Sequence, residues 1–79
     1  SDAQLQRIVA DALAESQIES MVIAKGYADC VAYISQDGIS VAVAAPENGL
    51  TQDDVSLVAD IVLSQTDRKL GDIRIFGIE

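Results

Sequence analysis

Several residue types that carry chemistry are scarce in this sequence or missing from it. It has no histidine, one cysteine and five basic residues among 79. Without histidine, neither a Ser-His-Asp triad nor a Cys-His pair can form. A single cysteine permits no internal disulfide and, without histidine, no zinc-type ligand set. These absences predict a protein that is not an enzyme and that holds no metal and no cofactor.

Glycine motifs for phosphate binding are absent as well. The five glycines form neither a P-loop nor the G-x-G-x-x-G fingerprint, and they leave no G-x-x-G clamp of the kind found in KH modules. They are Gly26, Gly38, Gly49, Gly71 and Gly77. The adjacent acids Asp53 and Asp54 point about 100° apart on a helix, so helix capping explains them better than a metal pair.

Positive charge is also in short supply. Thirteen acidic residues against five basic ones give a formal net charge of −8 and a pI near 4.1. Binding to nucleic acid requires a basic face, so this composition disfavours it. The longest run without a charged residue, 38–46, is far shorter than the ~20 apolar residues that span a bilayer. We therefore expect no membrane helix and no signal peptide within these residues.

What the sequence does contain is an aliphatic composition typical of one small folded domain, 1–79. Hydrophobic residues make up 49% of the chain and aromatic residues only 4%. Such a composition indicates a compact core and argues against disorder. A domain of this size buries only about 60% of its unfolded surface, so contact with a partner would add appreciably to its stability.

The first element predicted is a helix from Asp2 to about Ala24, ending at a glycine cap, Gly26. Its first half has apolar residues at helical spacing: Leu5, Ile8, Val9 and Ala12. Its second half carries Ile18, Met21 and Val22, about half a turn away from the first stripe. Either the helix bends near residues 15–17, or its halves bury different faces against different neighbours.

A hairpin and then a second helix follow. Asp37-Gly38 is typical of a two-residue type I′ turn, which would pair Gln36 with Ile39 and Ile34 with Val41. One face of this ribbon is then core, and the other is polar near the turn and apolar away from it. Next, Thr51 and Asp54 form a capping box for a helix that ends near Thr66.

The last element predicted is a strand from Asp72 to Ile78. Its alternation places Ile73 and Ile75 on the core side and Arg74 and Phe76 on the other. The predicted architecture is α+β, in the order αββαβ, with two helices on one face of a three-stranded sheet. The order of the third strand in the sheet stays open.

The second face of this sheet is left uncovered once the elements are used up. We expect it to be an interaction surface, because contiguous exposed apolar patches often are. Its residues are Val31, Tyr33, Ala42, Ala44, Phe76 and Arg74. A second candidate surface consists of Ile18, Met21 and Val22, which could equally be core.

Beyond these patterns, the run from about Ile18 to Ile75 resembles the C-terminal ectodomain of the stage III sporulation protein AH family. The resemblance rests on AKGYADCVAYI, DGISVAV, LTQDDVSLVADIVLSQT and DIRI. One departure is Asp67, where the family usually has glycine after the threonine. The resemblance implies the ring-building-motif fold, which is also found in the inner-membrane ring lipoproteins of type III secretion systems.

The same resemblance implies a function and a location. Members of the family are anchored in the mother-cell membrane by an N-terminal helix, absent from these residues, and project into the space between the membranes around the forespore. There they are expected to meet the ectodomain of stage II sporulation protein Q and to assemble, with other stage III proteins or with themselves, into a ring-shaped channel complex. The implied role is a structural, extracytoplasmic protein-protein interaction module.

Two alternatives from other classes remain. One is a small KH-like nucleic-acid-binding or regulatory domain, against which the acidity and the missing G-x-x-G clamp both argue. The other is a ligand-binding domain that dimerises through its sheet, for which the sequence shows no ligand site. A thermal shift that depends on a ligand would distinguish the second alternative.

Overall fold

The computed structural model describes residues 1–78. Within them it has two α-helices, a three-stranded sheet and one 3₁₀ turn. In chain order these are α1 (Asp2–Ala24), β1 (Cys30–Ser35), β2 (Gly38–Ala44), α2 (Gln52–Gln65), η1 (Leu70–Asp72) and β3 (Ile73–Ile78). The predicted αββαβ architecture is confirmed.

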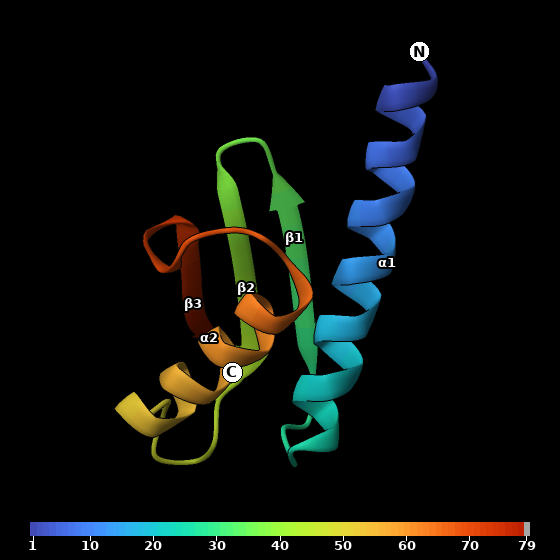
Figure 1. Cartoon of the computed structure of the whole chain (residues 1–79). Coiled ribbons are helices and arrows are strands. Elements are labelled where there is room, and N and C mark those ends of the chain that lie inside the picture. The colour runs from blue at the N-terminus through green and yellow to red at the C-terminus, as the bar shows by residue number, and fades with distance from the viewer. Residues whose placement is uncertain (79) are drawn as a thin grey trace.

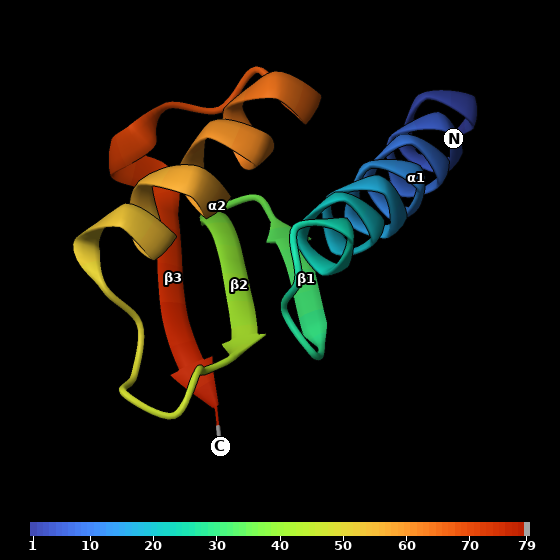
Figure 2. The same cartoon turned by 90° about the horizontal axis from the view of Figure 1, so that it is seen from below.

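The sheet has the order β1-β2-β3, which the sequence left open (Figure 1). β1 and β2 form an antiparallel hairpin, while β3 lies parallel to β2. Parallel neighbours need a crossover connection, and α2 supplies it. α2 lies across one face of the sheet, and α1 runs beside β1 on the same side (Figure 2).

The hairpin turn differs from the predicted one. Ser35 lies opposite Gly38, so the turn residues are Gln36 and Asp37, and the predicted pairing of Gln36 with Ile39 was wrong. Gly38 opens β2 with φ +149°, and a Cβ atom there would collide with the Asp72 carbonyl oxygen. Glycine is therefore needed at this position both for the positive φ beside the turn and for the close approach of the Asp72 backbone. The predicted faces remain correct because the pairing moved by an even number of positions.

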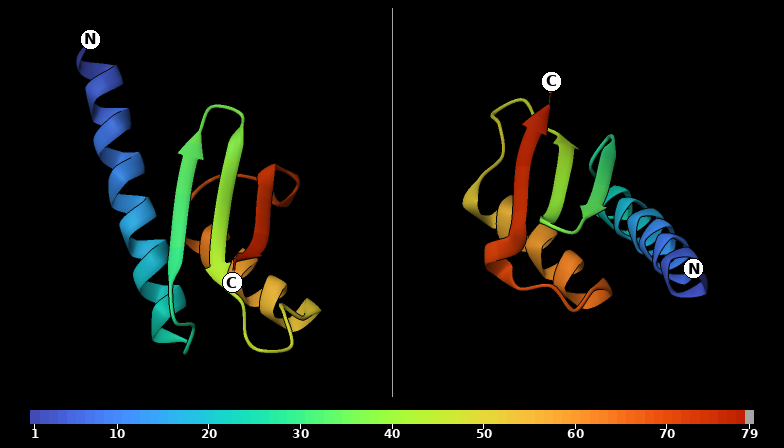
Figure 3. Two further views of the ribbon diagram at one scale, coloured as in Figure 1. Left: turned by 180° about the vertical axis from the view of Figure 1, so that it is seen from behind. Right: turned by 90° about the horizontal axis from the view of Figure 1, so that it is seen from above.

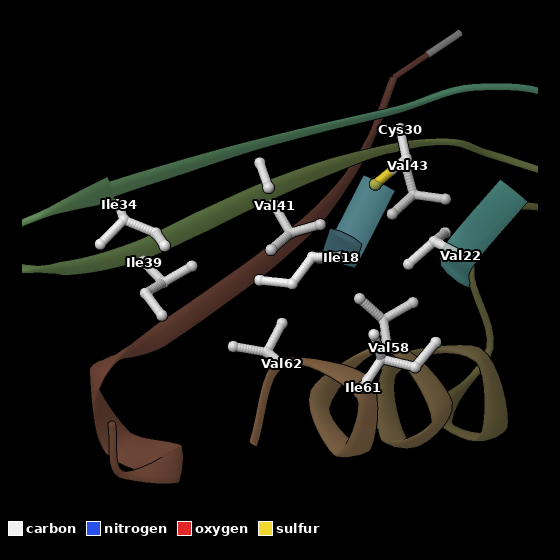
Figure 4. Packing of buried hydrophobic residues seen from close by; sticks show 11 residues of the cluster. Ile18, Val22, Cys30, Ile34, Ile39, Val41, Val43, Val58, Ile61 and Val62 are labelled. Atoms are coloured by element: carbon white, nitrogen blue, oxygen red, sulfur yellow. The ribbon is translucent and has the colours of Figure 1, made fainter. Parts of the chain in front are cut away.

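The core lies between the sheet and the helices (Figure 4). The sheet contributes alternate residues of β1 and β2, and the helices contribute a stripe from each. These buried residues are Cys30, Ala32, Ile34, Ile39, Val41, Val43, Ile18, Val22, Val58, Ile61 and Val62. Ile73 and Ile75 of β3 pack against them as predicted. Burying each large aliphatic side chain contributes about 1.5–3 kcal/mol, which makes this cluster the main source of stability.

Helix α2 begins with the predicted reciprocal cap. The Asp54 N–H donates to Thr51 Oγ1 at 3.2 Å, and the Thr51 N–H donates to Asp54 Oδ2 at 2.9 Å. The Tyr27 hydroxyl donates to the other oxygen of the same carboxylate, Asp54 Oδ1. Tyr27 lies between α1 and β1, so this contact joins the exit of the first helix to the start of the second.

Helix α1 is one continuous helix whose two halves have different surroundings (Figure 1). Ile18 and Val22 are fully buried, whereas the apolar residues of the first half are 59–65% exposed. Those exposed residues are Leu5, Ile8, Val9 and Leu13. The first half extends past the hairpin and makes the molecule 45 Å long. Gly26 ends the helix region with φ +111°, as the predicted cap requires.

Candidate contact surface

The face of the sheet that points away from α2 is open to solvent (Figure 3, left). The strand register arranges its residues in rows across the three strands. Val31 lies opposite Ala42, which lies opposite Phe76, so one row is wholly apolar. Val31 is 52% exposed and Phe76 is 48% exposed. Large side chains on both edge strands, with a small alanine between them, form a shallow apolar band.

A second row begins with an aromatic ring and ends with a cation. Tyr33 lies opposite Ser40, and Ser40 lies opposite Arg74. Tyr33 is 64% exposed, more than Val31, Phe76 or Ile78 on the same face. A tyrosine has an apolar ring and a polar hydroxyl. It can therefore face water in the free domain and pack against a partner in a complex.

The structure thus brings six of the predicted residues to one face of the sheet. They are Val31, Tyr33, Ala42, Ala44, Phe76 and Arg74. We call these residues, together with Ser40 and Ile78, the open face. Ile78 lies opposite Ala44 and is 39% exposed. The sequence analysis missed Ile78, although the alternation of Arg74 and Phe76 continues to it.

The second predicted surface, formed by Ile18, Met21 and Val22, is part of the core and is not exposed as a contact surface. Ile18 and Val22 have no exposed area, because they lie under β1 and β2 as members of the core. Met21 is half-buried and packs against the same cluster. The core alternative for these three residues is therefore the correct one.

A groove lies beside the open face, between the first half of α1 and the hairpin end of β1. Its volume is about 770 Å³. Tyr33 and Ile8 contribute apolar area, while Arg7 and Arg68 contribute positive charge. Arg68 is held in place because its Nη2 donates to the Ser35 carbonyl oxygen at 2.7 Å. Arg7 and Arg68, which are far apart in sequence, therefore line one groove, where Asp11 pairs with Arg7 at 4.0 Å. The sequence analysis did not anticipate this arrangement.

The outer edge of β1 is closed by two carboxylates of α1. The Ala32 N–H donates to Glu19 Oε2 at 2.8 Å, and the Ile34 N–H donates to Glu15 Oε2 at 2.7 Å. Exposed strand edges are sites of unwanted pairing, and these bonds occupy the donors of this edge. The glutamates are four residues apart and so lie on one side of the helix. The sequence analysis did not anticipate this role for the two glutamates.

The Cys30 thiol is an ionisable group that lies in the core. Burial, assisted by the nearby charges of Glu19 and Asp29, raises the pKa of the Cys30 thiol to about 11. A thiol with this pKa stays protonated near neutral pH and is a poor nucleophile. Cys30 is 4% exposed and packs as a small apolar residue of the core. Within residues 1–78, no three potential metal-ligating side chains lie close enough together to hold an ion.

The Tyr27 contact shifts the pKa values of both partners. Its hydrogen bond to Asp54, together with burial and the charge of Asp54, raises the pKa of Tyr27 to about 12. The bonds from the Thr51 backbone and the Tyr27 hydroxyl lower the pKa of Asp54 below its ordinary value. Both shifts favour the neutral phenol beside the ionised carboxylate, which is the state that stabilises the helix cap.

Two helices over one face of a β1-β2-β3 sheet, with the opposite face open, define the ring-building-motif fold. A solved structure, the type III secretion system protein EscJ of enteropathogenic E. coli, is similar to this chain with a TM-score of 0.75 and 21% identity. The alignment covers 92% of this chain and 49% of that chain, so this chain spans about half the length of EscJ. At this identity the likeness establishes the fold.

The family follows from the sequence. The family model for SpoIIIAH-like protein matches residues 2–75, and the chain belongs to this family. No curated protein gives a significant sequence match. Within residues 1–78, no helix has both the length and the apolar character required to cross a membrane.

Proposed function

We propose that this domain is a structural module of a sporulation channel, which uses the open face of its sheet to contact a neighbouring protein. Membership of the SpoIIIAH-like family over residues 2–75 supports the sporulation context. The fold shared with a type III secretion system protein supports a role in a secretion-like assembly. In this proposal the domain is not an enzyme, and its function is binding.

The observation that carries the proposal is the composition of the open face. Both helices pack on the other side of the sheet, so the apolar row of Val31, Ala42 and Phe76 has no cover within residues 1–78. Tyr33 and Arg74 border this row with groups that can hydrogen-bond or stack at an interface. An apolar centre with a polar, aromatic rim is the usual composition of a protein-protein contact.

The proposed partner is the ectodomain of stage II sporulation protein Q, presented from the forespore side. The domain would be anchored in the mother-cell membrane and would occupy the space between the two membranes. Further copies or other stage III proteins would complete a ring through heterologous contacts, which close only if the rotation per subunit permits. These details rest on the family relationship.

Charge affects which partner binds well. With a net charge of −8, two copies of this chain repel each other, most strongly at low salt. A less acidic partner avoids this repulsion and associates faster. We therefore expect the domain to bind its partner ectodomain more tightly than it binds itself.

Sedimentation equilibrium tests this proposal directly. The domain would be measured alone and mixed with the ectodomain of stage II sporulation protein Q, at low and at moderate salt. A heterologous complex at both salt concentrations is the expected result. The ligand-binding alternative would be supported instead if the domain does not bind this ectodomain at any concentration and its unfolding temperature rises with a small ligand.

A further inference from the structure

The two outer edges of the sheet are treated differently by the rest of the chain. The edge of β1 has its N–H groups occupied by Glu15 and Glu19 of α1. β3 forms the opposite edge, and no helix within residues 1–78 runs along its outer side (Figure 2). The edge of β1 is therefore closed by a helix, whereas the edge of β3 has beside it the loop that joins β2 to α2, with Leu50 near Gly77 (Figure 2).

The backbone groups that point outward from β3 follow from the register. The Ala45 N–H donates to the Ile78 carbonyl oxygen at 2.9 Å, so the backbone groups of Ile78 point toward β2. Because the pointing direction alternates along a strand, Ile73, Ile75 and Gly77 point outward. The Ile73 N–H already donates to the Leu70 carbonyl in η1. The free donors of this edge are thus the N–H groups of Ile75 and Gly77.

The side chains of β3 suit pairing with another strand. The strand reads IRIFGI, with one charge and no proline, over six residues. Such an apolar and regular edge lacks the devices that usually prevent strand addition, namely proline, several charges or a bulge. Ile75 is half-buried and Phe76 is 48% exposed, so both still have area to bury.

Local charge distinguishes β3 from the rest of the molecule. Within β3 the one charged residue is the cation Arg74, and the acidic Glu79 follows it in the sequence. Residues 1–65 contain two basic and ten acidic residues, which gives −8. Two copies of this acidic chain therefore approach each other with the least repulsion edge to edge at β3.

We propose that β3 pairs in an antiparallel arrangement with β3 of a second copy, centred on Ile75. In this register Ile75 lies opposite its own equivalent, and the two exchange backbone hydrogen bonds. Ile73 lies opposite Gly77 of the second copy, and the N–H of that Gly77 donates to the Ile73 carbonyl oxygen. The product is a six-stranded sheet with a two-fold axis through its centre.

The same register makes the side chains self-complementary. Arg74 of one copy lies opposite Phe76 of the second copy, on the open side of the sheet, and the reverse pair is formed by symmetry. A guanidinium beside an aromatic ring is a favourable cross-strand pair. The one charge of β3 therefore meets a ring rather than a like charge, which explains how two copies of one strand fit together.

This pairing uses the edge of the sheet and not its open face, so it does not depend on the proposed partner contact. The large remaining charge of each copy limits its strength. We expect a weak dimer that forms as concentration rises and that is favoured by moderate salt. The dimer joins two open faces into one continuous surface twice as wide.

Amide hydrogen exchange at two protein concentrations tests the pairing without any mutation. We expect exchange at Ile75 and Gly77 to slow by about fivefold or more in the concentrated sample, since a paired amide is protected. The amides of Ala32 and Ile34 serve as internal controls, because their bonds to glutamate are present in each single copy. Equal exchange rates for Ile75 at both concentrations would overturn the proposal.

A backbone substitution gives the second test. A chain of 79 residues is accessible to chemical synthesis, so the Ile75 amide can be N-methylated while the side chain is kept. This change removes the outward donor and should abolish the dimer in sedimentation equilibrium. N-methylation at Asn48, in the exposed loop between β2 and α2, is the matched control and should leave the dimer intact.

Two outcomes would count against edge pairing. A chain that remains monomeric at high concentration would overturn it outright. A dimer that survives N-methylation at Ile75 but is lost with Tyr33→Asp would overturn it in favour of pairing through the open face. Circular dichroism of each variant would verify that the monomer is folded before its association is compared.

Discussion

The two faces of the sheet are built from the same alternating sequence but end in opposite environments. On the covered face, Val41 and Val43 have no exposed area. On the open face, Val31 and Tyr33 are more than half exposed. The difference arises because both helices of the described chain pack on one side. A period-two pattern therefore reports which residues share a face, whereas the helices decide which face is covered.

The two halves of α1 also differ in whether their apolar side chains are covered. Ile18 and Val22 in the second half of the helix face the sheet and are buried, while Leu5 and Ile8 in the first half are 60% and 65% exposed. The first half extends past the hairpin, so the sheet does not cover it (Figure 1). Apolar surface is thus left on two elements, the sheet and the first half of α1, and both adjoin the groove that Tyr33 and Ile8 line.

The largest expected effect comes from placing the same charge on each face. Val41→Asp buries a carboxylate without a partner and should cost about 4 kcal/mol or more, enough to unfold a small domain. Val31→Asp places the carboxylate in water and should change the free energy of unfolding by less than about 1 kcal/mol. Urea denaturation measures both. Similar decreases in the free energy of unfolding for the two variants would contradict the conclusion that one face is buried and the other exposed.

An intermediate effect is expected at the closed edge of β1. Glu19→Ala leaves the Ala32 N–H without its acceptor in a partly buried place and should cost about 1–2 kcal/mol. Gln17→Ala, at an exposed position on the same helix, is the control and should cost less than about 0.5 kcal/mol. Thermal unfolding of the two variants compares them. Equal stability would show that the glutamate does not hold the edge.

The smallest effect is expected at the contact between Tyr27 and Asp54. Tyr27→Phe removes one hydrogen bond at the start of α2 and should lower the unfolding temperature slightly at neutral pH. Because folding raises the pKa of Tyr27 from 10.0 to about 12, this stabilisation is fully present below pH 10 and is lost as the pH rises toward 12.

The cap of α2, in which Asp54 accepts hydrogen bonds from the Thr51 backbone and from Tyr27, also predicts a loss of stability in acid. Folding lowers the pKa of Asp54, so the stabilisation is present above its ordinary value of 3.8 and is lost as the pH falls through the lower folded value. Unfolding temperatures of the wild type and of Tyr27→Phe, measured across pH, should therefore differ at neutral pH and converge at the alkaline end. A constant difference up to pH 12 would contradict the assignment.

Much of the fold was predictable because local signals dominate it. The reciprocal cap of Thr51 and Asp54 and the alternation in β1, β2 and β3 depend on near neighbours in the sequence. The hairpin turn was predicted wrongly because the Asp-Gly pattern placed Gly38 inside the turn, whereas Gly38 is the first residue of β2. Its backbone there lies close to that of Asp72, 34 residues away in the sequence. Local turn chemistry could not reveal that contact.

The candidate site was predictable to a similar extent. Alternation identified six residues of the open face, but Ile78 was overlooked at the end of the strand. The roles of Glu15 and Glu19 were not predictable, because their acceptor function depends on how α1 lies against β1. The core position of Ile18 and Val22 likewise depends on the direction in which the helix meets the sheet.

The most direct test of the open face compares two variants that add the same charge on opposite sides of the molecule. Tyr33→Asp changes an aromatic side chain of the open face that is 64% exposed, and Ser56→Asp changes an exposed position on α2. Both should remain folded. We predict that binding to the ectodomain of stage II sporulation protein Q weakens at least about tenfold for Tyr33→Asp and stays near wild type for Ser56→Asp. A folded Tyr33→Asp domain that binds this ectodomain as tightly as the wild type would contradict the account.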